Sequence, residues 1–287
     1  MRLVTFERNG TATCGVRRGE AIVDLSLAAP ALPGDWPAIF AAGALKEVAT
    51  AGESAPESAL VPAGEARLLT PIPNPPKILA IGLNYRSHAE ETGLPIPDYP
   101  IVFPRWPKSV VADGVPLVCP AASSTFDYEA ELLVVIGTGG RHIPKDKALD
   151  HVAGYACFND GSVRDYQVKS SQWAMGKNFD ASGSWGPDIV TADELPPGAA
   201  GLRIQARLNG ETLQDSDTAD MIFDVATIVS TLSEVMTLEP GDIIPTGTPP
   251  GVGMARDPRV WMKPGDTCEI EIEGIGTLSN PIIAEAV

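Results

Sequence analysis

Cysteine is scarce in this sequence, and its placement excludes two classes of site. The chain has 287 residues and only four cysteines, which form no Cys-x-x-Cys pair. They are Cys14, Cys119, Cys157 and Cys268. This scatter excludes a disulfide framework and is typical of reduced, mostly buried thiols in a cytoplasmic protein. The three histidines (His88, His142 and His151) show no ligand spacing with the cysteines, so we do not expect a zinc site.

Positive charge is also in short supply. The chain carries 21 lysines and arginines against 37 aspartates and glutamates, which gives a formal net charge of -16 at pH 7. A surface with this charge repels nucleic acids and anionic lipids, so we expect neither as a partner. It also repels an anionic substrate at long range. Binding such a substrate therefore requires a local cation, which is either a metal ion or a well-placed arginine or lysine.

Long apolar runs are missing as well. No stretch of the sequence approaches the roughly 18 consecutive apolar residues that a membrane helix needs. The first residues, MRLVTFE, are typical of a strand and lack the apolar core of a signal peptide. We therefore expect a cytoplasmic protein without a membrane segment.

The composition of the chain changes at about residue 70. Residues 1–70 contain two strand-like segments, a helix-like segment at residues 35–52, and an Ala-, Glu- and Pro-rich stretch at residues 51–66. We interpret residues 1–70 as a small N-terminal domain and residues 71–287 as the catalytic domain. The alternative is that the Ala-, Glu- and Pro-rich stretch is a surface loop within one domain.

The larger part has the periodicity of a mixed α/β fold that is rich in strands. Apolar residues recur at helical spacing between residues 221 and 236, which predicts a helix there. Between residues 268 and 273, apolar residues alternate with glutamates, which predicts a strand with one buried face. Glycine (28) and proline (27) are abundant and widely spread, which favours many turns over long helices.

Two glutamates stand at the start of the apolar run of residues 132–136. Glu129 and Glu131 are two residues apart, so in a strand both side chains point to the same face. Burying two like charges side by side is costly unless a cation binds them, although exposure of both at a strand edge is the simpler alternative. Asp160 follows another semi-apolar segment and can supply a third oxygen. Three carboxylates without histidine or cysteine predict a site for Mg²⁺ or Mn²⁺.

His88 and Glu91 form a second candidate pair. On a helix, residues that are three positions apart share a face. A carboxylate can orient an imidazole and raise its basicity, which prepares the imidazole to take a proton from water. The alternative is an incidental pair on a surface helix.

A lysine and a glycine-rich loop are weaker candidates. Lys177 lies in a loop-like segment among aromatic residues, where partial desolvation would let it hold a developing oxyanion, although most lysines face solvent. The segment PTGTPPGVG (residues 245–253) contains Thr246 and Thr248 and is suited to bind a carboxylate through backbone N–H groups. It is not a P-loop, because no Gly-Lys-Ser/Thr follows, and a structural turn is the alternative.

In combination, these segments resemble the fumarylacetoacetate hydrolase superfamily. The resemblance covers about residues 77–280 and rests on six segments together rather than on any one of them. They are KILAIGLNYRSHAEETG, FDYEAELLVVIG, DHVAGYACFNDGSVRDYQ, QWAMGKNFDASGSWGPDIVT, LNGETLQDSDTADMIF and EPGDIIPTGTPPGVG. The resemblance implies a β-sandwich roll with a small N-terminal domain, and a homodimer.

The resemblance also implies roles for particular residues. The metal ligands of the family are matched by Glu129, Glu131 and Asp160. Lys177 matches the lysine that helps to bind the substrate oxo or enolate oxygen, and His88 and Glu91 match the pair that activates water in hydrolytic members. The residues that the resemblance places in substrate binding are Tyr85, Gln167, Thr246 and Thr248.

The chain departs from the family pattern at two places. Leu83 stands where many members have an arginine, so a role of that arginine in gripping the substrate is not carried over. The segment FPRWPKS replaces the commoner Phe-Leu-Lys pattern and contains Arg105 and Lys108. We expect Arg105 and Lys108 to lie near the pocket, where one of them meets a second carboxylate of the substrate. A surface role is the alternative.

The function that the resemblance implies is metal-dependent cleavage of the C3–C4 bond of a 2,4-dioxo acid of the acylpyruvate type, which gives pyruvate and a carboxylic acid. His88 is the expected base, and Mg²⁺ or Mn²⁺ the expected cofactor. The same site can also support decarboxylation of a 2-oxo diacid, enol–keto isomerisation of the 2-hydroxyhepta-2,4-dienedioate type, or a sugar-acid or ureidoglycolate lyase reaction. A protein that binds a 2-oxo acid without altering it is the non-enzymatic alternative.

Overall fold

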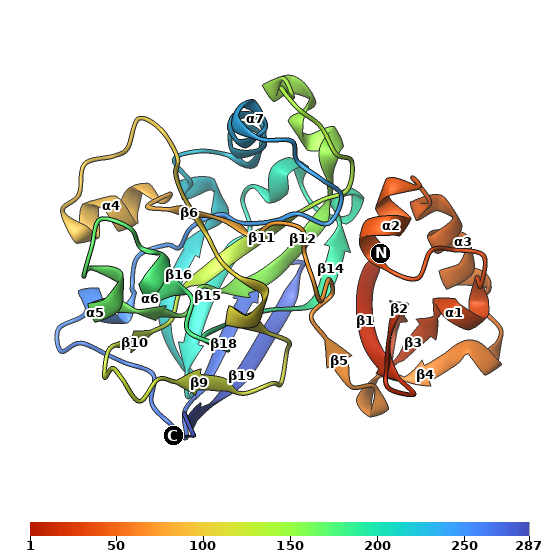
Figure 1. The fold of residues 1–287 in the computed structure, drawn as a ribbon, viewed down its shortest axis with the longest axis horizontal. Coiled ribbons are helices and arrows are strands. Elements are labelled where there is room, and N and C mark those ends of the chain that lie inside the picture. Colours follow the sequence, from red (N-terminus) through yellow and green to blue (C-terminus); the bar gives the residue numbers. More distant parts are fainter. Residues whose placement is uncertain (287) are drawn as a thin grey trace.

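A large, mainly antiparallel sheet runs through the molecule in the computed structural model, which describes residues 1–286 (Figure 1). The strands of its main path are, in sheet order, β17 (Ile243–Pro245), β11 (Ala130–Ile136), β12 (Val152–Asn159), β14 (Gly183–Thr191), β1 (Arg2–Arg8), β2 (Thr11–Arg18), β3 (Ala21–Asp24) and β4 (Leu60–Pro62). Two short strands lie off this path: β5 (Leu68–Leu69) pairs with β1, and β8 (Val110–Val111) pairs with β14.

A second sheet packs against the first. Its strands are, in sheet order, β16 (Glu211–Asp217), β15 (Arg203–Leu208), β18 (Thr267–Ile272), β19 (Gly276–Ala284) and β9 (Leu117–Cys119). Two small pairs complete the strands: β6 (Leu79–Gly82) with β7 (Ile101–Pro104), and β10 (Phe126–Asp127) with β13 (Ser162–Val163). Apolar and glutamate residues alternate along β18 between buried and partly exposed positions, as the sequence predicts.

The helices are short and lie around the sheets. They are α1 (Leu25–Ala28), α2 (Trp36–Ala41), α3 (Leu45–Ser54), α4 (Arg86–Thr92), α5 (Arg164–Gln167), α6 (Ala174–Lys177) and α7 (Val225–Val235). The helix predicted at residues 221–236 is confirmed as the shorter α7, because the helix begins only after Asp224, which accepts a hydrogen bond from the backbone N–H of Thr227. None of the helices described between residues 1 and 286 is long and apolar enough to cross a membrane.

Alternation along β11 builds two cores, one on each face of the main sheet. Leu132, Val134 and Ile136 face the core that includes the second sheet and α7. Leu133 and Val135 face the opposite core, which the N-terminal residues complete. All seven residues of β11 are buried, because each face of this strand is covered. The predicted class, a mixed α/β fold rich in strands, is thereby confirmed.

The N-terminal seventy residues share this architecture with the rest of the chain. β1 pairs with β14, and the second core joins Trp36 and Val48 to Phe158 and Trp185. Figure 1 shows α2 and α3 with β1–β3 grouped together beside β14. The helix expected at residues 35–52 is two helices, α2 and α3. The stretch at residues 51–66, expected as a spacer, ends α3 and supplies the edge strand β4.

Candidate active site

Three carboxylates meet where β11 begins and β12 ends. The two strands are antiparallel, with Ala130 opposite Asn159, so the residues around this pair fall at the same end of the sheet. Glu129 precedes β11, Glu131 is the second residue of β11, and Asp160 follows β12. The backbone N–H of Asp160 donates a 3.0 Å hydrogen bond to the carbonyl of Glu129. One ligand oxygen of each carboxylate lies within 4.8 Å of the other two, and all three residues are buried.

Cationic side chains surround two of these carboxylates. The Lys177 ammonium donates to Glu129 Oε2 at 2.7 Å and to Asp160 Oδ2 at 2.6 Å. Arg164 adds an ion pair of 2.6 Å to Glu129 Oε1, and Arg105 donates to Asp160 Oδ1 at 2.5 Å. Burial alone would raise the pKa of Glu129, but the charges of Lys177 and Arg164 outweigh it and lower that pKa.

Glu131 is the carboxylate that lacks a cationic side chain. Its Oε2 accepts a 2.9 Å hydrogen bond from the backbone N–H of Gly247. Burial and the negative charges of Asp160 and Glu129 raise the pKa of Glu131 well above the usual value. A divalent cation among the three carboxylates would offset this repulsion. The all-oxygen donor set therefore fits a hard ion such as Mg²⁺ or Mn²⁺.

The His88–Glu91 pair lies on α4, as the spacing predicts. His88 Nδ1 and Glu91 Oε2 are 3.1 Å apart, and Glu91 Oε1 accepts from the backbone N–H of Gly251 at 2.9 Å. Partial burial would raise the pKa of Glu91, but the hydrogen bonds from His88 and Gly251 lower it below the ordinary glutamate value. Both oxygens of Glu91 are thus held, and the imidazole that they orient lines the same cavity as the carboxylates.

A cavity of about 430 Å³ connects these groups. Its lining includes seven of the predicted residues, namely His88, Glu129, Glu131, Asp160, Gln167, Lys177 and Thr248. This volume lies within the range of small-molecule sites. The cavity contains acidic ligands, a base and a cation within reach of one small substrate.

Three residues expected in substrate binding lie behind the cavity wall instead. The Arg105 side chain is fully buried, and its guanidinium bonds to Asp160, Ser109 and Ser182. Thr246 is fully buried and donates its hydroxyl to the carbonyl of Leu132. Tyr85 is also fully buried. None of Arg105, Thr246 and Tyr85 belongs to the cavity lining among residues 1–286, and their expected contact with substrate stays a prediction. Lys108, expected beside Arg105, does not belong to the cavity lining.

The sequence reasoning missed three residues that build the site. Arg164 lines the cavity and binds Asp127 as well as Glu129. Asp127 accepts the backbone N–H groups of residues 253 and 254, and so holds the loop over the site. Gln214 accepts the N–H of Ala130 and donates to Thr248. Two of them lie close in sequence to predicted residues, because Arg164 follows Asp160 by four positions and Asp127 precedes Glu129 by two. Gln214 has no such sign.

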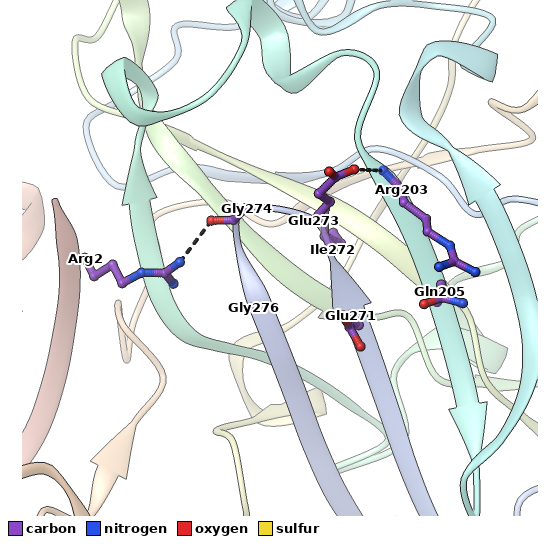
Figure 2. Close-up of a pocket in the computed structure, with 8 residues that line it drawn as sticks. All are labelled: Arg2, Arg203, Gln205, Glu271, Ile272, Glu273, Gly274 and Gly276. Atoms are coloured by element: carbon purple, nitrogen blue, oxygen red, sulfur yellow. Dashed lines mark hydrogen bonds between the residues drawn. The ribbon is translucent and has the colours of Figure 1, made fainter. Parts of the chain in front are cut away.

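A second hollow, of about 450 Å³, lies away from the carboxylates between β1, β15 and the β18–β19 hairpin. Figure 2 shows Arg2 reaching the carbonyl of Gly274 and Glu273 accepting the N–H of Arg203. The Arg203 guanidinium is paired with Asp215 at 2.6 Å. Because this hollow contains none of the predicted catalytic residues, we do not assign it as the active site.

Comparison with known proteins identifies the family. The sequence model for the C-terminal domain of fumarylacetoacetate (FAA) hydrolase matches residues 77–283. The mitochondrial oxaloacetate tautomerase fahd2 of Xenopus laevis is 37% identical over 298 residues, which cover 99% of this chain and 90% of that protein.

Solved structures agree with this match. Maleylpyruvate hydrolase from Sphingobium sp. SYK-6, in complex with manganese(II) ion and pyruvate, superimposes with a TM-score of 0.82 at 30% identity and full coverage of both chains. The 2-hydroxyhepta-2,4-diene-1,7-dioate isomerase from Mycobacterium marinum gives a TM-score of 0.80 at 32% identity, again over both whole chains. The chain thus belongs to the fumarylacetoacetate hydrolase family, whose named members here are enzymes.

Proposed function

We propose that this protein is a divalent-metal-dependent hydrolase that cleaves the C3–C4 bond of a 2,4-dioxo acid of the acylpyruvate type. The observation that carries this proposal is the joint presence, in one cavity, of the carboxylate triad and of His88, which Glu91 orients. The triad suits enolate chemistry at a 2-oxo acid, and the pair suits activation of water. A protein that only binds a 2-oxo acid has no need of the oriented base.

Glu129, Glu131 and Asp160 would hold Mg²⁺ or Mn²⁺, which when bound supplies Lewis-acid polarisation of the 2-oxo group. Two cationic side chains of the protein, Lys177 and Arg164, can bind the negatively charged oxygens of the substrate. The Lys177 ammonium donates to an enolate oxygen. Arg164 has one buried nitrogen, Nη2, without a hydrogen-bond partner among residues 1–286, and this nitrogen can donate to the C1 carboxylate.

His88 carries the proton through the reaction. Its imidazole takes a proton from water, and the resulting hydroxide adds to the C4 carbonyl. The C3–C4 bond then breaks, its electron pair moves to C3 to give pyruvate enolate, and C4 leaves as the carboxyl carbon of the acid. The proton on His88 returns to C3. The sum is one water consumed, with one pyruvate and one carboxylic acid released.

Keto–enol tautomerisation of a 2-oxo acid is a second candidate, which the similarity to oxaloacetate tautomerase over 99% of this chain favours. This reaction needs a proton to be moved between C3 and the C2 oxygen, without attack by water. His88 and Lys177 can supply the base and the oxyanion donor for it. The two candidates therefore share the site and differ in whether a C–C bond breaks.

Release of pyruvate from acetylpyruvate separates the two candidates. Pyruvate is measured by a coupled assay that reduces it to lactate. We expect Mg²⁺-dependent pyruvate formation that EDTA abolishes, and a loss of about 10²–10⁴-fold in kcat for His88→Ala. Glu131→Gln should remove both turnover and the thermal stabilisation by Mn²⁺. Enol loss without pyruvate would favour the tautomerase candidate, and full turnover by His88→Ala would exclude His88 as the base.

A further inference from the structure

Part of the active-site cavity is bounded by an aromatic wall, which we define as Phe103, Trp173 and the glycine that Trp173 covers, Gly82. A Cβ atom at Gly82 would lie 2.1 Å from the Trp173 ring, so the indole packs directly on the backbone of β6. The rings of Phe103 and Trp173 meet edge to face, with their centroids 5.7 Å apart. β6 and β7 pair antiparallel with Ile81 opposite Val102, which places Gly82 and Phe103 on one pair of strands.

The aromatic wall has a fixed position relative to the reacting groups. Trp173 is the N-cap residue of α6 and Lys177 is the last residue of that helix, so one helical turn carries both side chains. Lys177 Nζ lies 5.2 Å from the centroid of the Phe103 ring. A Cβ atom at Gly176 would lie 2.4 Å from the backbone N of Gln167, so α6 is tightly packed on α5. The wall therefore lies beside the Lys177 ammonium.

The cations that line the cavity all lie at its acidic end. Lys177 contacts Glu129 and Asp160, and Arg164 contacts Glu129. His88, the proposed base, is held by Glu91. The remaining lining residues among residues 1–286 carry no charge, and most have apolar side chains: Ile81, Leu83, Leu94, Phe103, Val168, Trp173 and Met254, beside Gly82, Thr92, Gln167 and Thr248. Arg105, the cation expected to meet a distal carboxylate, is enclosed behind Asp160.

The geometry points to selection of substrates with a single carboxylate. We infer that the aromatic wall and its apolar neighbours bind an apolar substituent beyond C3 of a 2-oxo acid, and disfavour a second carboxylate there. Apolar burial stabilises such a substituent, whereas a carboxylate in the same place would lose its hydration without gaining a cation. The inference rests on the proposed binding of 2-oxo acids, and it names their class: acylpyruvates with aliphatic or aryl acyl groups.

Two unreactive ligands of similar length test this preference by calorimetry in the presence of Mg²⁺. The ligand 2-oxohexanoate ends in an ethyl group where 2-oxoglutarate ends in a carboxylate, so their affinities compare the two tails directly. We expect 2-oxohexanoate to bind at least about tenfold more tightly, in line with burial of two carbons. Equal affinities, or tighter binding of 2-oxoglutarate, would overturn the inference.

Substitutions locate the preference on the wall. Trp173→Ala should reduce the ratio of the two affinities to within about threefold, while binding of oxalate, which fills the acidic end only, reports that the site is intact. Val168 is 68% exposed, so Val168→Lys is compatible with folding. This variant should shift the ratio of the two affinities about tenfold towards 2-oxoglutarate, whereas the matched uncharged variant Val168→Met should not. An unchanged ratio in both Trp173→Ala and Val168→Lys would contradict the assignment. Neither ligand is cleaved, so these results stand apart from the test of hydrolysis.

Discussion

Arg105 fixes the carboxylate of Asp160, a role that its position in the sequence does not reveal. Its guanidinium donates to Asp160 Oδ1, to the hydroxyls of Ser109 and Ser182, and to the carbonyl of Ser109. A buried arginine with this many partners fixes the carboxylate that it contacts. The sequence placed a cation near the pocket, but whether that cation faces the cavity or supports its wall depends on packing that no local pattern encodes.

We expect substitution of Arg105 to weaken metal binding, because Arg105 holds the metal ligand Asp160 in place. Arg105→Lys offers one compact charge in place of a planar set of donors, and we expect a loss of about tenfold in Mn²⁺ affinity, with a loss of up to about 100-fold for Arg105→Met. Electron paramagnetic resonance of free Mn²⁺ measures both. Arg67→Lys, at a pair that is 71% exposed on the arginine side, is the control. Wild-type Mn²⁺ affinity in Arg105→Met would contradict the supporting role.

The charge on Glu91 should make a pH-dependent contribution to stability. Its pKa is lowered in the folded protein, because the hydrogen bonds from His88 and Gly251 outweigh the opposite effect of burial. A carboxyl group with a lowered folded pKa stabilises the fold above its unfolded pKa, about 4.3, and loses that contribution as the pH falls through the folded value.

The unfolding free energies of wild type and Glu91→Gln, measured with urea, test this linkage. Below about pH 5 their difference should shrink as the pH falls, because the Glu91 carboxylate becomes protonated there. Glu90→Gln, at the exposed neighbouring position on the same helix, serves as the matched control. A difference that grows as the pH falls would show that the sign is wrong.

Among the elements, the loop after β17 links the triad to the rest of the cavity. The backbone N–H of Gly247 donates to Glu131, and Gly247 has a φ of 98°. Its place is also crowded, because a Cβ atom there would lie 2.7 Å from Asn84 Cβ. The sequence predicts this loop to bind a substrate carboxylate; in the structure, one of its N–H groups instead binds a carboxylate of the protein.

Gly247→Ala tests the role of this loop. Gly265→Ala, in the turn before β18, is its matched control. Both glycines have positive φ, 98° and 96°, but a Cβ atom at Gly265 meets nothing within 4 Å. We expect both variants to lose about 1 kcal/mol of stability from the backbone strain. Only Gly247→Ala should also weaken Mn²⁺ binding, by about tenfold or more, because its N–H is displaced from Glu131. Equal Mn²⁺ affinities in the two variants would contradict this role.

Elements with a clear period were predictable from the sequence, and packing between elements was not. The apolar spacing of residues 221–236 predicts α7, and the i, i+2 spacing of Glu129 and Glu131 predicts neighbouring carboxylates at the start of a strand. The approach of Asp160 to them depends on the register of β11 against β12, which the resemblance supplied and periodicity cannot.

For the whole molecule, the boundary expected at residue 70 crosses a shared core. Trp36 and Val48 from the N-terminal part pack in one cluster with Leu133 and Phe158 of the main sheet. Local composition suggested a spacer there because alanine, glutamate and proline are common in linkers, but the pairing of β3 with β4 is a long-range contact. The division into residues 1–70 and 71–287, like the expected homodimer, stays a prediction.

Deletion of residues 1–70 tests the importance of the shared core. The truncated chain would expose the face of β11, β12 and β14 that the N-terminal helices cover, so we expect it to aggregate or to bind the dye ANS rather than to fold as an independent catalytic domain. Far- and near-ultraviolet circular dichroism would measure this. A soluble, metal-binding fragment with one cooperative transition would show that residues 71–287 fold alone.

The central claim is that water, activated at His88, attacks C4 of a 2,4-dioxo acid. Reaction of benzoylpyruvate with the Mg²⁺-loaded protein in H₂¹⁸O, with mass spectrometry of the products, tests this claim most directly. We predict one ¹⁸O atom in the carboxylate of the released benzoic acid and the loss of this product when His88 is replaced by alanine. Recovery of intact benzoylpyruvate, with no benzoic acid formed, would contradict the claim.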